Sequence, residues 1–222
     1  MPIGKVISWA FALLPLLMVL VFLPFLPETV PVHVGFGGTV TRYGSPMEWM
    51  FVSLFPILMQ AVPVVVKWQY KGNDDAIARN LKVLGKMNIA ISMIFLGLIL
   101  WFVFLTLSES GATQPAVDVE RIVGVIISLS WIIIGNFLPQ VKKNMLLGIR
   151  TTWTLKCETT WAKTHRLGGR LFVGMGIAST ILCLFVLEGL PAIIFSTAAP
   201  APLVVVLIAY SYDTFKKTEL SI

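Results

Sequence analysis

The chain has 222 residues, of which 57% are hydrophobic and only 13% are charged, and its mean hydropathy is +0.87. This composition excludes an ordinary water-soluble domain and is typical of a polytopic membrane protein. The formal net charge of +6 would suit a nucleic-acid partner only on a soluble fold with a basic face, so we expect no direct nucleic-acid binding. Beside apolar segments, basic residues set orientation and contact anionic lipid.

Six windows are apolar and long enough to cross a bilayer, at roughly 20 residues each. The first follows Lys5 and has no small-x-small cleavage site before Pro27, so it is predicted to be a retained span and not a secretory signal. Prolines interrupt the sixth, which predicts a broken or kinked helix. The windows are 6–26, 48–66, 87–107, 122–138, 171–188 and 191–212.

The basic residues fix the predicted orientation. All Lys and Arg residues except Arg42 and Arg121 fall on one side of these spans. By the positive-inside rule that side is cytoplasmic, which places both termini inside and the loops 27–47, 108–121 and 188–191 outside.

The first outward loop, 27–47, is rich in Pro and Gly and is predicted to be turn-rich and locally fixed. We expect His33 to order this loop by hydrogen bonding. The connection 67–86 is polar and cytoplasmic, and Asn73-Asp74-Asp75 is expected to cap a short helix from Ala76 onward.

Residues 139–170 form a basic, Trp- and Thr-rich island between the fourth and fifth spans. Thr154 is a candidate N-cap and Gly168-Gly169 a candidate stop, which predicts a helix of about three to four turns. Cys157, Trp161 and His165 are four apart and share one face, while basic residues gather on another. Such a helix is expected to lie in the membrane interface, with its ring face toward the acyl chains.

Two interpretations of the island remain open. In one, it anchors and orients the bundle: Arg150 would clamp a phosphate, and Trp153 and Trp161 would sit at headgroup depth. In the other, the same residues dock an acidic or amphipathic partner. Asn136, beside Pro139, is expected to satisfy carbonyls freed by the proline or to bond a neighbouring helix. The candidate partner- or lipid-binding residues are Asn136, Asn144, Arg150, Thr152, Trp153, Thr154, Trp161, His165 and Arg166.

Neither histidine has enough neighbouring ligands for a metal site, so no metal or cofactor is expected. Cys157 and Cys183 lack CxxC spacing and are predicted to be free thiols. The sequence holds no catalytic motif, which argues against an enzyme. The spans hold almost no ionisable groups, which argues against a proton-coupled transporter. The acids at span ends are expected to be solvated: Glu48, Glu188 and Asp213.

Several motifs together resemble the signature of the SdpI family of bacterial membrane proteins. They are Ile134-Gly-Asn-Phe-Leu-Pro139, Lys142-Lys-Asn144, Leu147-Gly-Ile-Arg-Thr-Thr-Trp-Thr154 and Trp161-Ala-Lys-Thr-His-Arg-Leu-Gly-Gly169. The outward loop, with Val30-Pro-Val-His33, Gly38 and Arg42-Tyr-Gly-Ser45, resembles the small uncharacterised domain that commonly precedes it. His33, Gly38 and Arg42 are its candidate site residues.

The resemblance implies a multi-pass protein of the bacterial cytoplasmic membrane. It also implies immunity to a secreted antimicrobial peptide toxin, and a receptor role in which a soluble transcriptional repressor is held at the membrane. Thr41 and Pro46-Met47 depart from the usual pattern of the outward loop, which argues against an ion-binding or salt-bridged role there.

The sequence therefore predicts an all-α, six-transmembrane-helix bundle with cytoplasmic termini and a short interfacial helix between spans four and five. Three parts are expected: a two-span module at 1–66, a connection with the third span at 67–119, and an SdpI-like module at 120–222. The predicted function is binding and neutralising a peptide toxin, with the lipid bilayer, the toxin and a repressor as partners. The alternatives are a small exporter of peptide or lipid and an intramembrane enzyme, which would show as gradient-dependent efflux and as a modified peptide respectively.

Overall fold

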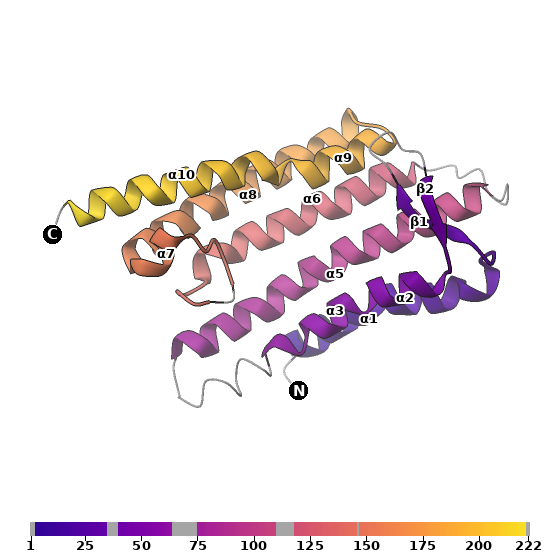
Figure 1. The fold of residues 1–222 in the computed structure, drawn as a ribbon, viewed down its shortest axis with the longest axis horizontal. Helices are drawn as coiled ribbons and strands as arrows, with labels where there is room; N and C mark the ends of the chain where they lie inside the picture. Colours follow the sequence, from indigo (N-terminus) through magenta and orange to yellow (C-terminus); the bar gives the residue numbers. More distant parts are fainter. Residues whose placement is uncertain (1–2, 35–39, 64–74, 110–117, 146, 221–222) are drawn as a thin grey trace.

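In the computed structural model, the described residues are 3–34, 40–63, 75–109, 118–145 and 147–220. Long helices lie side by side along the long axis of the molecule, with a small hairpin at one end (Figure 1). In this part of the chain five helical segments are long and apolar enough to cross a membrane, which confirms the polytopic all-α class. They comprise α1 (Ile3–Phe22), α5 (Asp75–Glu109), α6 (Val119–Phe137), α8 (Glu158–Phe185), and α9 (Leu190–Ala198) with α10 (Pro200–Glu219).

The second predicted span differs from expectation. Its place is taken by two short helices, α2 (Met47–Ser53) and α3 (Phe55–Met59). At about 1.5 Å per residue this stretch is roughly 20 Å long, short of the roughly 30 Å of a hydrocarbon core. Pro56, in the first turn of α3, has no backbone N–H to donate, and residues 64–66 of the predicted span lie outside the described residues.

Two other predicted elements have changed bounds. The short helix expected from Ala76 is continuous with the third span, because α5 runs unbroken from Asp75 to Glu109. Asn73 and Asp74, its expected caps, lie outside the described residues. The sixth predicted span is interrupted as expected: α9 ends at Ala198, and α10 begins at Pro200, which has no backbone N–H to continue the hydrogen-bond ladder.

The outward loop contains an antiparallel hairpin that the sequence analysis did not predict. Strands β1 (Val30–Val34) and β2 (Val40–Gly44) pair with Val30 opposite Gly44 and Val34 opposite Val40. Valines alternate along β1, a strand pattern that Pro31 and the density of turn residues obscured. A 3-10 turn, η1 (Leu23–Phe25), leads from α1 toward β1.

The island folds differently from the predicted interfacial helix. A 3-10 turn, η2 (Leu138–Gln140), ends α6, and only a short helix, α7 (Thr152–Lys156), precedes α8. Cys157 separates α7 from α8, because its backbone is extended (φ −127°, ψ 124°). The N-cap is Thr151 and not Thr154, and the predicted stop at Gly168-Gly169 is wrong because α8 continues to Phe185.

These glycines allow close packing between helices. A Cβ at Gly169 would lie 2.6 Å from Cγ of Pro139 and 2.8 Å from the carbonyl O of Gly135. On the facing helix, a Cβ at Gly135 would lie 2.8 Å from Cβ of Phe172. Helices α6 and α8 therefore meet at backbone distance, as small residues permit in membranes.

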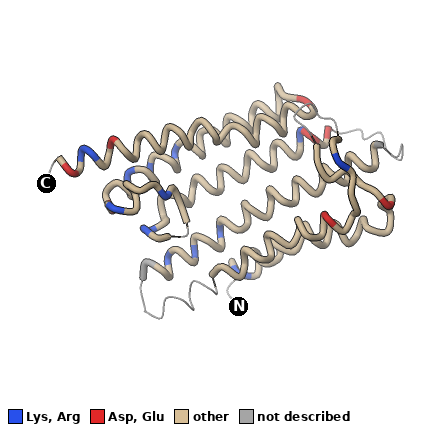
Figure 2. Tube along the Cα trace, in the orientation of Figure 1, with Lys and Arg blue, Asp and Glu red and all other residues tan. Residues whose placement is uncertain are grey.

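Charge divides the molecule into two ends. Lys and Arg gather at the end that carries α7, the start of α5 and the last turns of α10 (Figure 2). We call this the basic end, and the opposite end, with β1 and β2, the hairpin end. At the hairpin end Asp118 caps α6 through the Arg121 N–H and accepts from the Gly189 N–H, both at 2.9 Å, while Arg121 pairs with Glu188 at 2.7 Å. The division matches the orientation predicted from the loops.

Candidate functional site

A buried tryptophan joins the hairpin to the helices at the hairpin end. Trp49 of α2 is 2% exposed and donates its Nε1–H to the carbonyl O of Pro31 in β1 at 3.0 Å. Its ring packs against Phe102 of α5, with 5.8 Å between ring centroids. A single side chain thus fixes β1, α2 and α5 relative to one another.

An ion pair lies beside this junction. Arg42 of β2 donates to Glu48 of α2 as a fork, with Nη2 2.8 Å from Oε2 and Nη1 3.3 Å from Oε1. Gly44 makes room for it, since a Cβ there would collide with Glu48 Oε1. The expectation that this loop holds no salt bridge is therefore wrong: its carboxylate comes from the first turn of α2, not from position 41.

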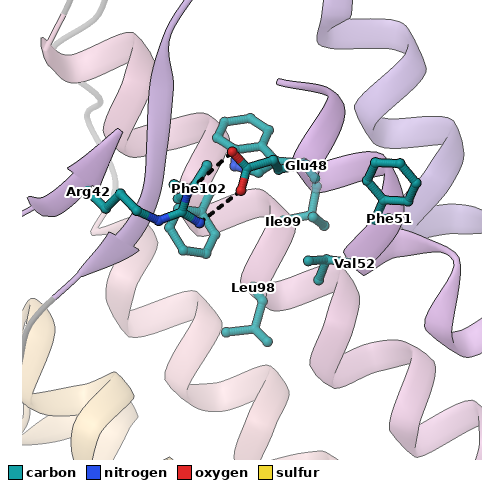
Figure 3. A pocket seen from close by; sticks show the side chains of 9 residues that line it. Arg42, Glu48, Phe51, Val52, Leu98, Ile99 and Phe102 are labelled. Atoms are coloured by element: carbon teal, nitrogen blue, oxygen red, sulfur yellow. Dashed lines mark hydrogen bonds and ion pairs between the residues drawn. The ribbon is translucent and has the colours of Figure 1, made fainter. Parts of the chain in front are cut away.

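An apolar pocket of about 310 Å³ opens below this ion pair. Figure 3 shows the Arg42–Glu48 fork at its rim, α2 side chains on one wall and α5 side chains on another. A volume at the low end of ligand pockets suits one or two large apolar groups, oriented by the charged pair. The lining residues are Val32, Arg42, Glu48, Trp49, Phe51, Val52, Leu98, Ile99 and Phe102.

The other predicted hairpin residues have local roles or fall outside the description. His33 Nδ1 lies 2.6 Å from Thr41 Oγ1 on the facing strand, and Thr41 Oγ1 also donates to the His33 carbonyl O. This confirms that His33 orders its loop by hydrogen bonding. Gly38 lies outside the described residues.

At the basic end, side chains from distant segments hold the backbone of the island. Asn80 of α5, 7% exposed, makes both bonds of an amide pair with Lys142: its Nδ2 donates to the Lys142 carbonyl at 3.0 Å, and its Oδ1 accepts from the Lys142 N–H at 2.7 Å. Trp161 Nε1 donates to the Val141 carbonyl at 2.8 Å. The first residues of the island are therefore tied to α5 and α8 together.

His165 closes the next part of the island. Its Nε2 accepts the Ile149 backbone N–H at 3.0 Å, so its Nδ1, 2.9 Å from the Trp161 carbonyl O, must carry the proton. The two rings stack with centroids 4.0 Å apart. Gly148 allows this approach because it has a φ of +99° and because any Cβ would collide with His165 Nε2. The imidazole is held as the neutral tautomer.

Threonines fix the last turn of the island. Thr151 and Thr154 form a reciprocal capping box for α7, and Thr154 Oγ1 also donates to the Ile149 carbonyl at 2.8 Å. Thr151 Oγ1 lies 3.0 Å from Ser211 Oγ of α10, and Trp153 meets Tyr212 edge to face. The island is thereby closed against α10.

These contacts divide the predicted island residues into two groups. Cys157, Trp161 and His165 were expected to turn a ring face toward lipid, but Trp161 is 3% and His165 1% exposed, and both bind backbone. Thr154 is fully buried, and Asn144 folds the loop by accepting the Leu147 N–H at 2.7 Å. Trp153 is half-buried. The residues left at the surface are Asn136, Arg150, Thr152 and Arg166.

The surface residues have few contacts of their own. Arg150 donates to the carbonyl of Met145 within the island. Asn136 was expected to bond a neighbouring helix, but its side chain is exposed and only its carbonyl accepts a bond, from Gln140 Nε2. Arg150 and Arg166 remain accessible to a phosphate or a carboxylate.

Both cysteines are free thiols, as predicted. Cys157 precedes α8, and the nearby Thr160 side chain, with the first N–H groups of the helix, lowers the pKa of its thiol. Within the described residues, no three of His, Cys, Asp and Glu come together in a way that could hold a metal ion.

Sequence analysis missed polar residues whose partners are remote. Besides Asn80 and Ser211, a buried cluster joins α1, α3 and α5: Ser8 Oγ donates to the Gly85 carbonyl at 3.0 Å, and Gln60 Nε2 donates to the Ser8 carbonyl at 3.0 Å. Asn88 adds a bond to the Met59 carbonyl at 3.1 Å. The only signal in the sequence is a polar side chain within an apolar window.

The sequence is similar to two protein families and to one curated protein. A family model described as the SdpI/YfhL protein family matches residues 140–212, and one for a domain of unknown function, DUF1648, matches residues 10–59. Residues 140–212 are therefore similar to the SdpI/YfhL family. The curated Immunity protein SdpI of Bacillus subtilis (strain 168) is 31% identical over 96 residues, which are 43% of this chain and 46% of that relative. The chain thus matches less than half the relative's length, and no solved structure matches it.

The SdpI-like segment begins in η2 and ends in α10. It therefore contains both partners of the island hydrogen bonds made by Trp161, His165 and Thr151, whereas Asn80 belongs to α5 outside it. The segment similar to DUF1648 contains most of α1, the hairpin, α2 and α3. The pocket lies between this domain and α5. The resemblance identified from the residues is confirmed, and the chain is a membrane protein with an SdpI-like module.

Proposed function

We propose that this chain is an immunity protein of the bacterial cytoplasmic membrane, which binds a secreted amphipathic peptide toxin at its hairpin end. The proposal rests on the pocket below the Arg42–Glu48 fork, in a chain that is 31% identical over 96 residues to an immunity protein. The positive-inside rule places the hairpin end outside the cell, where a secreted peptide arrives.

The pocket supplies what an amphipathic peptide needs. Its apolar walls accept a large apolar side chain, and the fork at its rim offers a donor and an acceptor to polar groups beside that side chain. Trp49 and its bond to Pro31 hold the walls in place before binding, which lowers the entropy lost on binding. A peptide held there is kept from disrupting the bilayer.

A second function is to hold a soluble transcriptional repressor at the cytoplasmic face. It is favoured because α5 extends from the pocket to the island. Leu98, Ile99 and Phe102 of α5 line the pocket, and Asn80 on the same unbroken helix holds the backbone of the island. A peptide that binds one position of α5 better than another would shift the island with it. The repressor would bind the exposed bases Arg150 and Arg166 of the island.

Binding accounts for these features without catalysis or transport. The family named by the comparisons is not a known enzyme family. Several buried polar side chains, such as Ser8 and Gln60, bind backbone groups of other helices and thereby join helices together.

The test is survival of toxin-sensitive Bacillus cells that express the chain, challenged with medium from cells that secrete the toxin to which SdpI-bearing cells are immune. We expect the chain to protect, and Val52→Trp, which fills the pocket from its lipid-side wall, to abolish protection. Val205→Trp on the lipid face of α10 is the matched control, since Val205 is 67% exposed and outside the pocket.

Two negative outcomes of this experiment lead to different conclusions. No protection by the unmodified chain, at a membrane abundance equal to that of SdpI, overturns the proposed function. Protection that survives Val52→Trp removes the pocket from the mechanism and leaves the function standing.

A further inference from the structure

Two basic segments that are far apart in the sequence meet at the basic end. Arg79, Lys82 and Lys86 recur every three or four residues on α5, so they share one face of that helix, and all three are exposed. Lys142 and Lys143, also exposed, follow η2. The amide pair between Asn80 and Lys142 holds the two segments together. Five cations thus come from two segments joined by a buried contact.

These five cations have no ionic partner among the described residues. Among the described residues, the basic members of the ion pairs are Arg42, Arg121 and Lys217. Like charges gathered in this way repel one another, and an anion bound among them removes the repulsion. The patch therefore favours a ligand with more than one negative charge.

The patch lies at the depth of lipid headgroups. The Nζ of Lys86 stands 4.6 Å from the centroid of the Phe137 ring, and Phe137 is the last residue of α6. A lysine whose stem lies along a spanning helix directs its ammonium group to the membrane surface. Here that group lies where the apolar part of the bundle ends.

From this geometry we infer that the α5–η2 patch, made by Arg79, Lys82, Lys86, Lys142 and Lys143, is a binding site for an anionic phospholipid with two phosphates. Lysine and arginine donors bind phosphate oxygens, and basic sites between spanning helices on this side of a membrane suit such headgroups. The depth of Lys86 favours a lipid over a soluble anion or protein. The site is separate from the pocket at the hairpin end and does not depend on toxin binding.

The test is native mass spectrometry of the full-length chain in detergent, titrated with cardiolipin, phosphatidylglycerol or phosphatidylethanolamine. We expect cardiolipin to bind at least tenfold more tightly than phosphatidylethanolamine, with phosphatidylglycerol between them. The double variant Lys82→Gln/Lys142→Gln should lower the cardiolipin affinity about 25-fold, at about fivefold for each cation removed.

The matched control is Lys163→Gln/Arg170→Gln, which removes two exposed bases from α8 at the same end of the molecule but outside the patch. It should keep the cardiolipin affinity within about twofold. Equal losses in both double variants would show attraction by net charge only and overturn the site. Inorganic pyrophosphate that competes at micromolar concentration would show a soluble anion site and overturn the lipid assignment. The lipid assignment would also be overturned if the patch variant no longer bound a soluble protein while its cardiolipin affinity stayed unchanged.

Discussion

Replacing Asn80 with alanine should loosen the island from α5. The substitution removes two hydrogen bonds, of 3.0 Å and 2.7 Å, from a side chain that is 7% exposed, and leaves the N–H and the carbonyl of Lys142 without these partners. Each such bond contributes about 0.5–1.5 kcal/mol net, so the free energy of unfolding should fall by about 1–3 kcal/mol. Since 1.4 kcal/mol is a factor of ten, the unfolding equilibrium constant should rise about 5- to 150-fold.

The assay is reversible unfolding of the purified chain in mixed micelles of increasing SDS fraction, followed by circular dichroism. Asn136→Ala is the matched control, because Asn136 is an exposed amide at the end of α6, and it should change the midpoint little. If Asn80→Ala and Asn136→Ala shift the midpoint equally, the amide pair does not hold the island. The proposed coupling through α5 would fall with it.

Three further substitutions test the packing by the same assay. Gly148→Ala forces a side chain into a φ of +99° and against His165, and should cost about 1–3 kcal/mol, whereas Gly174→Ala, with open space around it, should not; equal effects would contradict the described approach. Trp161→Phe keeps an aromatic ring but loses the bond to the Val141 carbonyl, so about 1–3 kcal/mol should be lost, and no loss would mean that the bond is unimportant. Gly135→Ala places a Cβ 2.8 Å from Cβ of Phe172 and should cost about 1–3 kcal/mol by separating α6 from α8; a neutral result would disprove backbone contact there.

Periodicity and charge predicted the helices and their direction, because both depend on local sequence. The same signals could not say what a helix face meets. Trp161 and His165 do share a face, but that face binds the island backbone and not lipid, since the loop before α7 folds over it. Arg150 and Arg166 were correctly expected at the surface, where charge is cheapest.

Residues with two physical uses were the main source of error. Gly168-Gly169 could either end a helix or allow two helices to pack closely. The close approach of Gly135 and Pro139 on the facing segment shows that these glycines serve helix packing. Thr41 argued against a salt bridge in the outward loop, but Glu48 of the next helix pairs with Arg42. Asn80 was assigned only to a polar connection. Its contact with Lys142 could not be predicted, because the two residues are 62 positions apart in the sequence.

Labelling of Cys157 tests directly whether the hairpin end faces outward and the island faces the cytoplasm. Cys183 is fully buried, whereas Cys157 is accessible and its thiol pKa is lowered. A membrane-impermeant maleimide should therefore label a Ser45→Cys variant in intact cells but leave Cys157 unlabelled until the membrane is opened, and Cys157→Ser should remove that later signal. Labelling of Cys157 in intact cells would place the island outside and contradict both the toxin site and the link to an internal regulator.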